Sequence, residues 1–391
     1  MKTKGAVILK PGKDKPLLHR HHWIFSGAIS SLPDFADGDL LPVETHDRKC
    51  VGTAYFNKKA TIAGRMVAFG ERDPYEAIEK NLQEALDFRE RMFSGSNTTA
   101  YRLVNGEGDL LPGLVIDRYA DVLVLQISTL GMERLKSFIV DLLLRKLKPK
   151  AIFEKSTLAS RKEEGLQEVQ GVLFGDKPGE IEVLEHGLRF IVHPEEGQKT
   201  GFFLDHREMR QGMRELSFNK RVLNCFAYTG GFSVYAGAGG AEQVVSVDIS
   251  DKAMAMARRN VAANNLPNNN QEFITADVFA YLRQNPIDSD LVILDPPAFA
   301  KRRKDIVAAC RGYKDINRLA MQKMPKQSIL LTCSCSYFVD EALFQKVVFQ
   351  AAVEAGRSAR IIGRHRMAAD HPVNICHPEG DYLKSLLIYL A

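Results

Sequence analysis

The distribution of apolar positions changes about half-way along the chain. From about residue 220, short segments that are apolar on both faces alternate with helical segments, whereas nearer the N-terminus the apolar segments are separated by turn residues. Strands of the first kind, with helices between them, are typical of a doubly wound parallel sheet. The segments that predict this sheet are RVLNCFAY, QVVSVDIS, QEFITADV, DLVILDPP and SILLTCSCS.

The first 190 residues predict two smaller domains. Residues 1 to about 75 contain GAVILKPG, LLPVETHD, CVGTAYFN and TIAGRMVAF, which favour a small β-barrel. A helix should begin near residue 74, because DPYEAIEKNLQEALDFRERMF has helical apolar spacing and an acidic first turn. We therefore predict an α/β protein with a β-barrel over 1–75, a central α+β domain over 76–190 and a Rossmann-like domain over 191–391.

Composition narrows the class of protein. The 391 residues are 45% hydrophobic and 26% charged, which is the balance of a soluble globular protein with two or three domains. No apolar run is long enough to cross a bilayer, and MKTKGAVILKPGKDK lacks the pattern of a signal peptide, so we expect a cytoplasmic protein without a membrane partner. The net charge of +5 permits a polyanionic partner.

Acidic residues end three successive strands of the predicted sheet. Ligands of such sheets bind at the carboxyl ends of the strands. Gly230 and Gly231 follow the first strand, Asp248 ends the second, placed for ribose hydroxyls, and Asp277 ends the third, placed beside an adenine ring; the fourth ends at Asp295. Each feature alone has a structural alternative, a tight turn for the glycines and a helix N-cap for an aspartate. The series together predicts a nucleotide-type cofactor.

A dinucleotide-binding oxidoreductase shares the first two of these features, the glycine pair and the acid that ends the second strand. A dinucleotide-binding oxidoreductase would carry G-x-G-x-x-G directly after the first strand, but GAGGAE lies after the first helix instead. The rigid DPP at the end of the fourth strand also favours methyl transfer. We therefore expect S-adenosylmethionine as the cofactor.

Several motifs together resemble one known family. VLNCFAYTGGFSV, VVSVDIS, LDPPAF, CRGYKDIN and TCSCS are similar to the class I methyltransferases that make 5-methylcytosine in bacterial large-subunit (23S) ribosomal RNA. GQKTGFFLDHR, ADHPV and EGDYLK extend the likeness, and RHHWIFSGAI resembles the start of that family's RNA-binding PUA barrel. The resemblance implies a PUA domain, a central domain and a C-terminal methyltransferase domain.

The resemblance also implies which residues bind the cofactor. The loop from Asn224 to Gly231 would surround it, Asp248 would hold the ribose, and Asp277 with Val278 would frame the adenine. Four residues before the first strand of the sheet would close over it. The whole predicted set is Gln198, Lys199, Thr200, Phe203, Asn224, Phe226, Tyr228, Thr229, Gly230, Asp248, Ile249, Asp277, Val278, Asp295 and Pro296.

The chemistry of cytosine C5 calls for a thiolate and an acid. C5 is a poor nucleophile, and a thiolate that adds to C6 makes it enamine-like. Asp295 is the expected partner of cytosine N3 and the amino group. The rival reading is an amino-group methyltransferase for adenine N6 or cytosine N4, in which an aromatic directly follows D/N-P-P; here Ala298 follows and Phe299 comes one place later.

Cys333 and Cys335 both stand in TCSCS. If the strand continues through this segment, the two side chains lie on the same side. A metal site would need two further ligands, and no second cysteine pair exists to provide them, so no metal is expected. T-C-S is the signature of many RNA cytosine-5 methyltransferases and selects Cys333, but the closer resemblance fixes S-C-S. We predict Cys335 as the nucleophile and Cys333 as a packed neighbour.

Basic and aromatic residues near both ends of the chain suggest RNA contacts. The crowded histidines around Trp23 fit an RNA-binding edge better than a zinc site, and the run KRRK follows the proposed catalytic loop, although a solvated loop is an alternative. The predicted RNA-binding residues are His21, Trp23, Arg302, Arg303, Arg311, Tyr313 and Lys314.

The predicted function is therefore a 23S ribosomal RNA cytosine-5 methyltransferase. Two alternatives stay open, an amino-group RNA methyltransferase and a non-catalytic ribosome-assembly protein that binds RNA. Ribosomal RNA is the expected partner, and a homodimer is left open beside a monomer.

Overall fold

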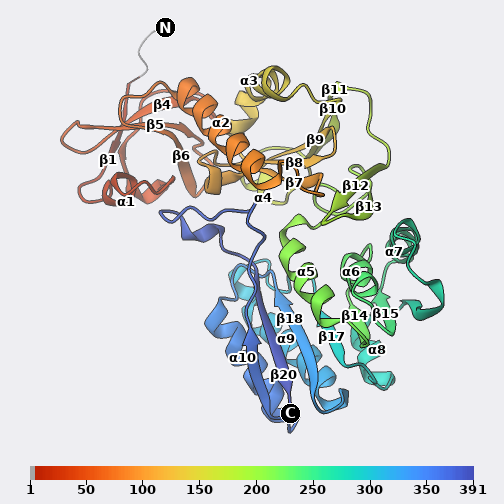
Figure 1. Ribbon diagram of the computed structural model, residues 1–391. Helices are drawn as coiled ribbons and strands as arrows, with labels where there is room; N and C mark the ends of the chain where they lie inside the picture. Colours follow the sequence, from red (N-terminus) through yellow and green to blue (C-terminus); the bar gives the residue numbers. More distant parts are fainter. Residues whose placement is uncertain (1–4) are drawn as a thin grey trace. The chain divides into compact units, whose positions relative to one another are not determined.

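The computed structural model describes residues 5–391, which form two compact units. The first contains the described residues up to Val183 together with Val192–Leu204 and Ala369–Gly380. The second contains Leu184–Ile191, Asp205–Ala368 and Asp381–Ala391. Figure 1 labels many of the elements of both units and colours the chain along its sequence. No helix within residues 5–391 is long and apolar enough to cross a membrane.

A six-stranded sheet begins the first unit, in the order β2-β6-β5-β4-β1-β3. Its neighbouring strands are antiparallel except for the parallel pair β1 and β4, and its core contains Leu41, Phe56 and Met66. The predicted strand-rich region is confirmed. The elements are β1 (Val7–Leu9), α1 (Lys15–Leu18), β2 (Trp23–Phe25), β3 (Ile29–Ser31), β4 (Leu40–Glu44), β5 (Cys50–Phe56) and β6 (Ile62–Phe69).

A second sheet of the first unit has five strands in the order β11-β10-β9-β8-β7. Helix α2 begins at Pro74, as predicted, because the Asp73 carboxylate accepts hydrogen bonds from the first-turn N–H groups of Tyr75 and Glu76. The elements are α2 (Pro74–Phe93), β7 (Ala100–Asn105), β8 (Leu114–Tyr119), β9 (Val122–Ile127), α3 (Leu130–Leu147), β10 (Ala151–Ser156), α4 (Ser160–Glu163) and β11 (Val169–Gly175). A hairpin of β12 (Ile181–Glu185) and β13 (Leu188–Val192) follows, of which Leu184–Ile191 belong to the second unit.

The second unit is built on a seven-stranded sheet in the order β16-β15-β14-β17-β18-β20-β19. The five predicted strands are parallel, and β20 and β19 add an antiparallel edge. The strands are β14 (Arg221–Cys225), β15 (Gln243–Asp248), β16 (Gln271–Thr275), β17 (Leu291–Leu294), β18 (Ser328–Ser334), β19 (Ala359–Gly363) and β20 (Lys384–Leu390). The predicted α/β class and Rossmann-like fold are confirmed.

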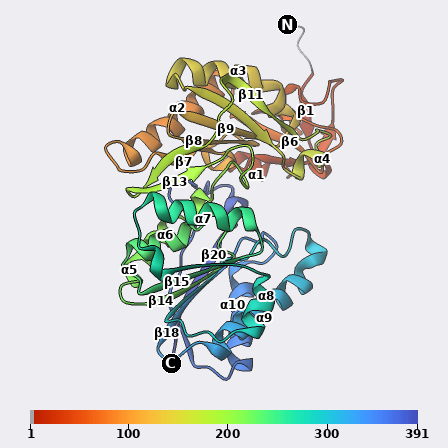
Figure 2. The ribbon, with the colours of Figure 1, turned by 90° about the vertical axis from the view of Figure 1, so that its right-hand side faces the viewer.

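Helices cover both faces of this sheet (Figure 2). Successive residues of β17 point to opposite faces: Val292 and Leu294 pack with α8, α9 and α10, whereas Leu291 and Ile293 pack with α5 and α6. This explains why β17 is apolar at every position. The helices are α5 (Arg207–Leu216), α6 (Gly231–Ala238), α7 (Asp251–Ala263), α8 (Val278–Gln284), α9 (Ile306–Lys323) and α10 (Glu341–Glu354).

Candidate active site

The loop between β14 and α6 is held in a conformation that favours glycine. Gly230 has a φ of +77°, and a Cβ atom there would lie 2.9 Å from Ala257 Cβ. Phe226 and Tyr228 also have positive φ angles, of 60° and 48°. Non-glycine residues rarely adopt such angles, and they concentrate at functional sites. The loop therefore carries backbone strain where the sequence predicts a cofactor.

Two buried polar atoms, one near the end of β14 and one in this loop, have no hydrogen-bond partner within residues 5–391. They are Asn224 Oδ1 and Thr229 Oγ1. The Asn224 amide nitrogen is engaged, because it donates to Ser233 Oγ at 2.8 Å. Buried polar atoms are nearly always hydrogen-bonded, so the two unpartnered oxygens fit a polar ligand at this loop.

Asp248 connects the end of β15 to the same loop. Its Oδ2 accepts a hydrogen bond from the Tyr228 N–H at 2.9 Å, and its Oδ1 accepts one from the Ser250 N–H at 3.0 Å. Each carboxylate oxygen keeps further lone pairs for hydroxyl groups of a ligand. The next residue, Ile249, is 72% exposed and offers an apolar surface beside that carboxylate.

Asp277 performs the structural role that the sequence left open as an alternative. Its Oδ1 caps helix α8 by accepting a hydrogen bond from the Ala280 N–H at 2.8 Å. The Val278 side chain is 2% exposed and packs in the core with Leu282, so only its backbone can contribute to a ligand site. The adenine-framing role of both residues stays a prediction.

Asp295 follows β17 and is hydrogen-bonded to a histidine that sequence reasoning missed. Asp295 Oδ1 lies 3.1 Å from His206 Nε2, and His206 Nδ1 lies 3.2 Å from Asp205 Oδ1. Burial alone would lower the pKa of His206, but the two carboxylates outweigh it and raise this pKa to about 9. The segment GQKTGFFLDHR contains His206, but nothing in its local pattern indicates a contact with Asp295.

The two cysteines of TCSCS differ in environment. Strand β18 ends at Ser334, so Cys335 is the first residue beyond it and the premise of a continuous strand is wrong. Cys333 is fully buried, with its Sγ 3.9 Å from Met209 Sδ, and burial raises the pKa of its thiol well above the ordinary range. Cys335 is partly exposed, and its Sγ lies 3.8 Å from the Pro296 carbonyl oxygen in the DPP loop.

A lysine next to this cysteine was also missed. The Lys384 ammonium donates hydrogen bonds to the carbonyl oxygens of Ser336, at 2.7 Å, and Tyr382, at 2.8 Å. Burial lowers the pKa of Lys384, and negative charge on Cys335 acts in the opposite direction. The cation is therefore close enough to interact with a thiolate at Cys335.

Comparisons with known proteins give two matching families and several relatives. Residues 168–373 match the family described as S-adenosylmethionine-dependent methyltransferase, and residues 7–69 match a family described as PUA-like domain. The chain is 42% identical to ribosomal RNA large subunit methyltransferase I of Aeromonas hydrophila, over 98% of this chain and 99% of that protein. The chain belongs to the ribosomal RNA large subunit methyltransferase I family. The resemblance read from the motifs is thereby confirmed.

Other members and a solved structure extend the comparison. The family member of Escherichia coli strain E24377A is 40% identical over 97% of both chains. The crystal structure of SMU.776, complexed with SAH, has a TM-score of 0.86, is 24% identical, and covers 98% of this chain and 100% of that one. The family uses S-adenosylmethionine, as predicted, and the unpartnered oxygens of Asn224 and Thr229 fit a polar cofactor in the β14–α6 loop.

Four residues predicted to close over the cofactor belong to the first unit: Gln198, Lys199, Thr200 and Phe203. Thr200 is fully buried there, where its hydroxyl donates to Asp117 Oδ2 at 2.6 Å and lies 2.8 Å from the Tyr119 hydroxyl. The Lys199 ammonium lies 4.4 Å from the centre of the Phe203 ring. Their contact with the cofactor stays a prediction for this family member.

Of the predicted RNA contacts in the second unit, Tyr313 needs correction. It is fully buried, its hydroxyl lies 2.8 Å from Ser336 Oγ, and its ring centre lies 4.6 Å from that of Phe299, so its side chain packs in the interior. The Lys314 ammonium forms an ion pair with Glu354 at 2.7 Å. The remaining three, Arg302, Arg303 and Arg311, are exposed and stay candidates for phosphate contacts.

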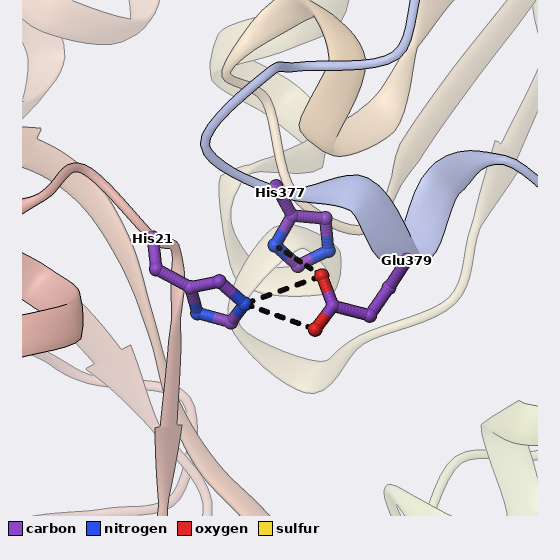
Figure 3. A group of neighbouring side chains, drawn as sticks. All are labelled: His21, His377 and Glu379. Carbon is purple, nitrogen blue, oxygen red and sulfur yellow. Dashed lines mark hydrogen bonds and ion pairs between the residues drawn. The ribbon is translucent and has the colours of Figure 1, made fainter.

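His21 and Trp23 of the PUA-like domain belong to a network in the first unit. The Trp23 indole N–H donates to Glu107 Oε1 at 2.8 Å. His21 Nε2 lies 3.3 Å from both oxygens of Glu379, and His377 Nδ1 lies 3.7 Å from one of them (Figure 3). The RNA-binding role of His21 and Trp23 stays a prediction.

His21, His377 and Glu379 offer the ligand atoms of a metal site, but the hydrogen bonds of His21 favour a tautomer that does not bind a metal through Nε2. The Trp23 backbone N–H donates to His21 Nδ1 at 3.2 Å, so in a neutral imidazole the proton is on Nε2 and is donated to Glu379. A metal at Nε2 would need that nitrogen deprotonated and Nδ1 protonated. We interpret the group as a hydrogen-bonded attachment of segment 369–380 to the N-terminal sheet.

Proposed function

We propose that this protein methylates C5 of a cytosine in large-subunit (23S) ribosomal RNA, with Cys335 as the nucleophile. The observation that carries the proposal is the partly exposed Cys335 thiol at the end of β18, beside the Pro296 carbonyl of the DPP loop that also holds Asp295. The printed names of the relatives, ribosomal RNA large subunit methyltransferase I, support the choice of substrate.

Residues of this site account for two steps of the reaction, the nucleophilic addition and the stabilisation of the adduct. The Cys335 thiolate adds to C6 of the cytosine, forming an S–C6 bond and breaking the C5=C6 π bond, with the negative charge delocalised over C5, N3 and O2. Asp295 would face N3 and the amino group: N3 gains a proton through Asp295, which neutralises this charge, and the Asp295 carboxylate accepts hydrogen bonds from the resulting N3–H and from the amino group. After C5 has gained the methyl group, a base removes the C5 proton, the electron pair of that C–H bond re-forms the C5=C6 double bond, and the S–C6 bond breaks to restore the thiolate.

The cofactor supplies the methyl group as an electrophile on a sulfonium. The residues of this chain that would hold it are those of the β14–α6 loop and the next two strand ends. Asp248 would accept hydrogen bonds from ribose hydroxyls, and Asn224 Oδ1 and Thr229 Oγ1 would gain the partners that they lack among the described residues. Ile249 would cover an adenine face.

The amino-group alternative is less well supported. Those enzymes stack the target base on an aromatic residue directly after D/N-P-P, but the position here is Ala298. The next residue, Phe299, packs against Tyr313, with ring centres 4.6 Å apart, and against Phe279, with ring centres 6.0 Å apart. Such an enzyme would also have no use for the Cys335 thiol.

Methyl transfer to ribosomal RNA followed by nucleoside analysis tests the proposal. The RNA comes from cells that lack the enzyme, and the cofactor carries a labelled methyl group. We expect label in 5-methylcytidine with the wild-type protein and with Cys50→Ala, an exposed cysteine of the first unit. Cys335→Ala should abolish transfer, and Cys333→Ala should only weaken it.

Other outcomes select the alternatives. Label in N6-methyladenosine or N4-methylcytidine would show an amino-group enzyme. No transfer to any ribosomal RNA would favour a non-catalytic RNA-binding protein. Activity of Cys335→Ala together with loss of activity in Cys333→Ala would assign the nucleophile to the other sulfur.

A further inference from the structure

His206 lies in a line of titratable groups that leads into the proposed active site. Beyond it, the Asp205 carboxylate also accepts a hydrogen bond from the Tyr382 hydroxyl at 2.5 Å. The order is therefore Tyr382, Asp205, His206 and Asp295, all within the second unit. Of Asp205, His206 and Asp295, only Asp295 is appreciably exposed, with 22% of its side chain accessible to solvent.

The contacts of His206 indicate a doubly protonated ring. A neutral imidazole carries one N–H, so it can donate to one carboxylate at most, whereas the imidazolium donates from both nitrogens. His206 has a carboxylate oxygen near each nitrogen, and 4% of its side chain is exposed. A charge buried to this extent needs such partners, and each carboxylate likewise needs the cation.

Two further neighbours of His206 are uncharged. The Cys333 thiol approaches from β18, with its sulfur within 4.8 Å of the ligand atoms of His206 and Asp295, and burial keeps this thiol in its neutral form. The Phe232 ring of α6 meets the imidazole edge-on, with centres 6.0 Å apart. The raised pKa of His206 agrees with the geometry.

We propose that His206 is the positioning residue of Asp295, holding Oδ1 through its Nε2–H so that Oδ2 remains for the edge of the cytosine. The inference rests on the proposed function, since Asp295 must face the base for its orientation to matter. Asp205 fixes the other end of the imidazolium, and Tyr382 fixes Asp205. The orientation of Asp295 is therefore set by a protonated ring anchored at both nitrogens.

Two substitutions test the hydrogen bonds of the two His206 nitrogens separately. His206→Gln places an amide N–H near the position of Nε2, where it can still donate to Asp295. His206→Asn places one near the position of Nδ1, where it reaches Asp205 but not Asp295. His46→Gln, at an exposed histidine of the first unit, is the matched control. Methyl transfer to ribosomal RNA is measured from pH 6 to pH 10 for each protein.

The positioning role makes three predictions. His206→Asn should lower kcat by about tenfold to a hundredfold, the loss expected for a misplaced catalytic group. His206→Gln should keep the larger part of kcat at pH 7. Above pH 8 the imidazolium loses its proton, so the kcat of the wild type should decline. His206→Gln should lack this decline. Titration of the RNA affects both enzymes equally and does not produce a difference between them.

A purely structural role of His206 predicts a different result. It would lower the melting temperature and kcat of the two variants alike and leave the alkaline decline in His206→Gln, and this result would overturn the inference. Nucleoside analysis of the wild-type product separates this failure from that of the proposed function. Formation of 5-methylcytidine without a difference between the variants removes only the role of His206.

Discussion

The buried imidazolium of His206 should make the stability of the second unit depend on pH. Its pKa is about 9 in the folded protein and 6.5 for an ordinary histidine. A group whose pKa is raised on folding stabilises the protein fully below the ordinary value, and this contribution is lost as the pH rises through the folded value. The window is therefore pH 6.5 to about 9.

The size of the effect follows from the two pKa values. At about 1.4 kcal/mol for each unit of pKa, the contribution is roughly 3 kcal/mol at low pH and nearly zero above pH 10. The side chain is 4% exposed, so solvent does not screen it. We expect the free energy of unfolding of the wild type, relative to His206→Gln, to fall by roughly this amount between pH 6 and pH 10.

Urea unfolding with two probes measures this difference. The thiols of Cys225 and Cys333 are fully buried in the second unit and become available to a thiol reagent only when that unit unfolds. The fluorescence of Trp23, the only tryptophan, reports the first unit. Comparison of the two proteins at each pH removes the pH dependence of the thiol reaction itself.

Plots of the free energy of unfolding against pH that run parallel for the wild type and His206→Gln would refute the reasoning. If the difference between wild type and His206→Gln, followed by thiol labelling, is the same at pH 6 and pH 10, then His206 is not an imidazolium in the folded protein. The transition reported by Trp23 serves as an internal control, and we expect the substitution to leave its pH dependence unchanged.

Three further predictions concern the cofactor loop, the thiolate and the RNA. Gly230→Ala would place a Cβ atom 2.9 Å from Ala257 Cβ, at a φ of +77° that costs a non-glycine residue about 1–2 kcal/mol. Calorimetry should therefore show about tenfold weaker binding of S-adenosylmethionine, and an unchanged affinity would contradict this. Lys384→Met removes the cation next to Cys335 and should slow alkylation of that thiol by iodoacetamide by about threefold to tenfold, as read by peptide mass spectrometry; an equal rate would exclude the interaction. Replacing both arginines of the run 301–304 by alanine should reduce the slope of log binding constant against log salt concentration by about 2, and an unchanged slope would make this run a solvated loop.

The parts of the site that follow from sequence are those fixed by the sheet itself. Asp248, Asp277 and Asp295 could be placed because parallel strands bring their carboxyl ends to one edge, and the apolar strands before them were recognisable. Cys335 could be selected by its motif, although the end of β18 at Ser334 could not be foreseen.

Contacts between distant segments could not be predicted in this way. His206 meets Asp295 across 89 residues, and Lys384 meets Ser336 across 48, through pairs that leave no periodic signal. The same holds for Tyr313, whose basic neighbours suggested RNA although the ring packs on Phe299. Tertiary packing decides these positions, and only the folded sheet and helices bring them together.

Trapping the covalent intermediate tests the central claim most directly. In ribosomal RNA that contains 5-fluorocytidine, the fluorine at C5 cannot leave as a proton does, so the S–C6 bond persists after methyl transfer. Digestion and mass spectrometry then identify the cysteine attached to the nucleotide. We predict a methylated 5-fluorocytidine adduct on Cys335. An adduct on Cys333, or 5-methylcytidine formed from ordinary RNA by Cys335→Ala, would contradict the account.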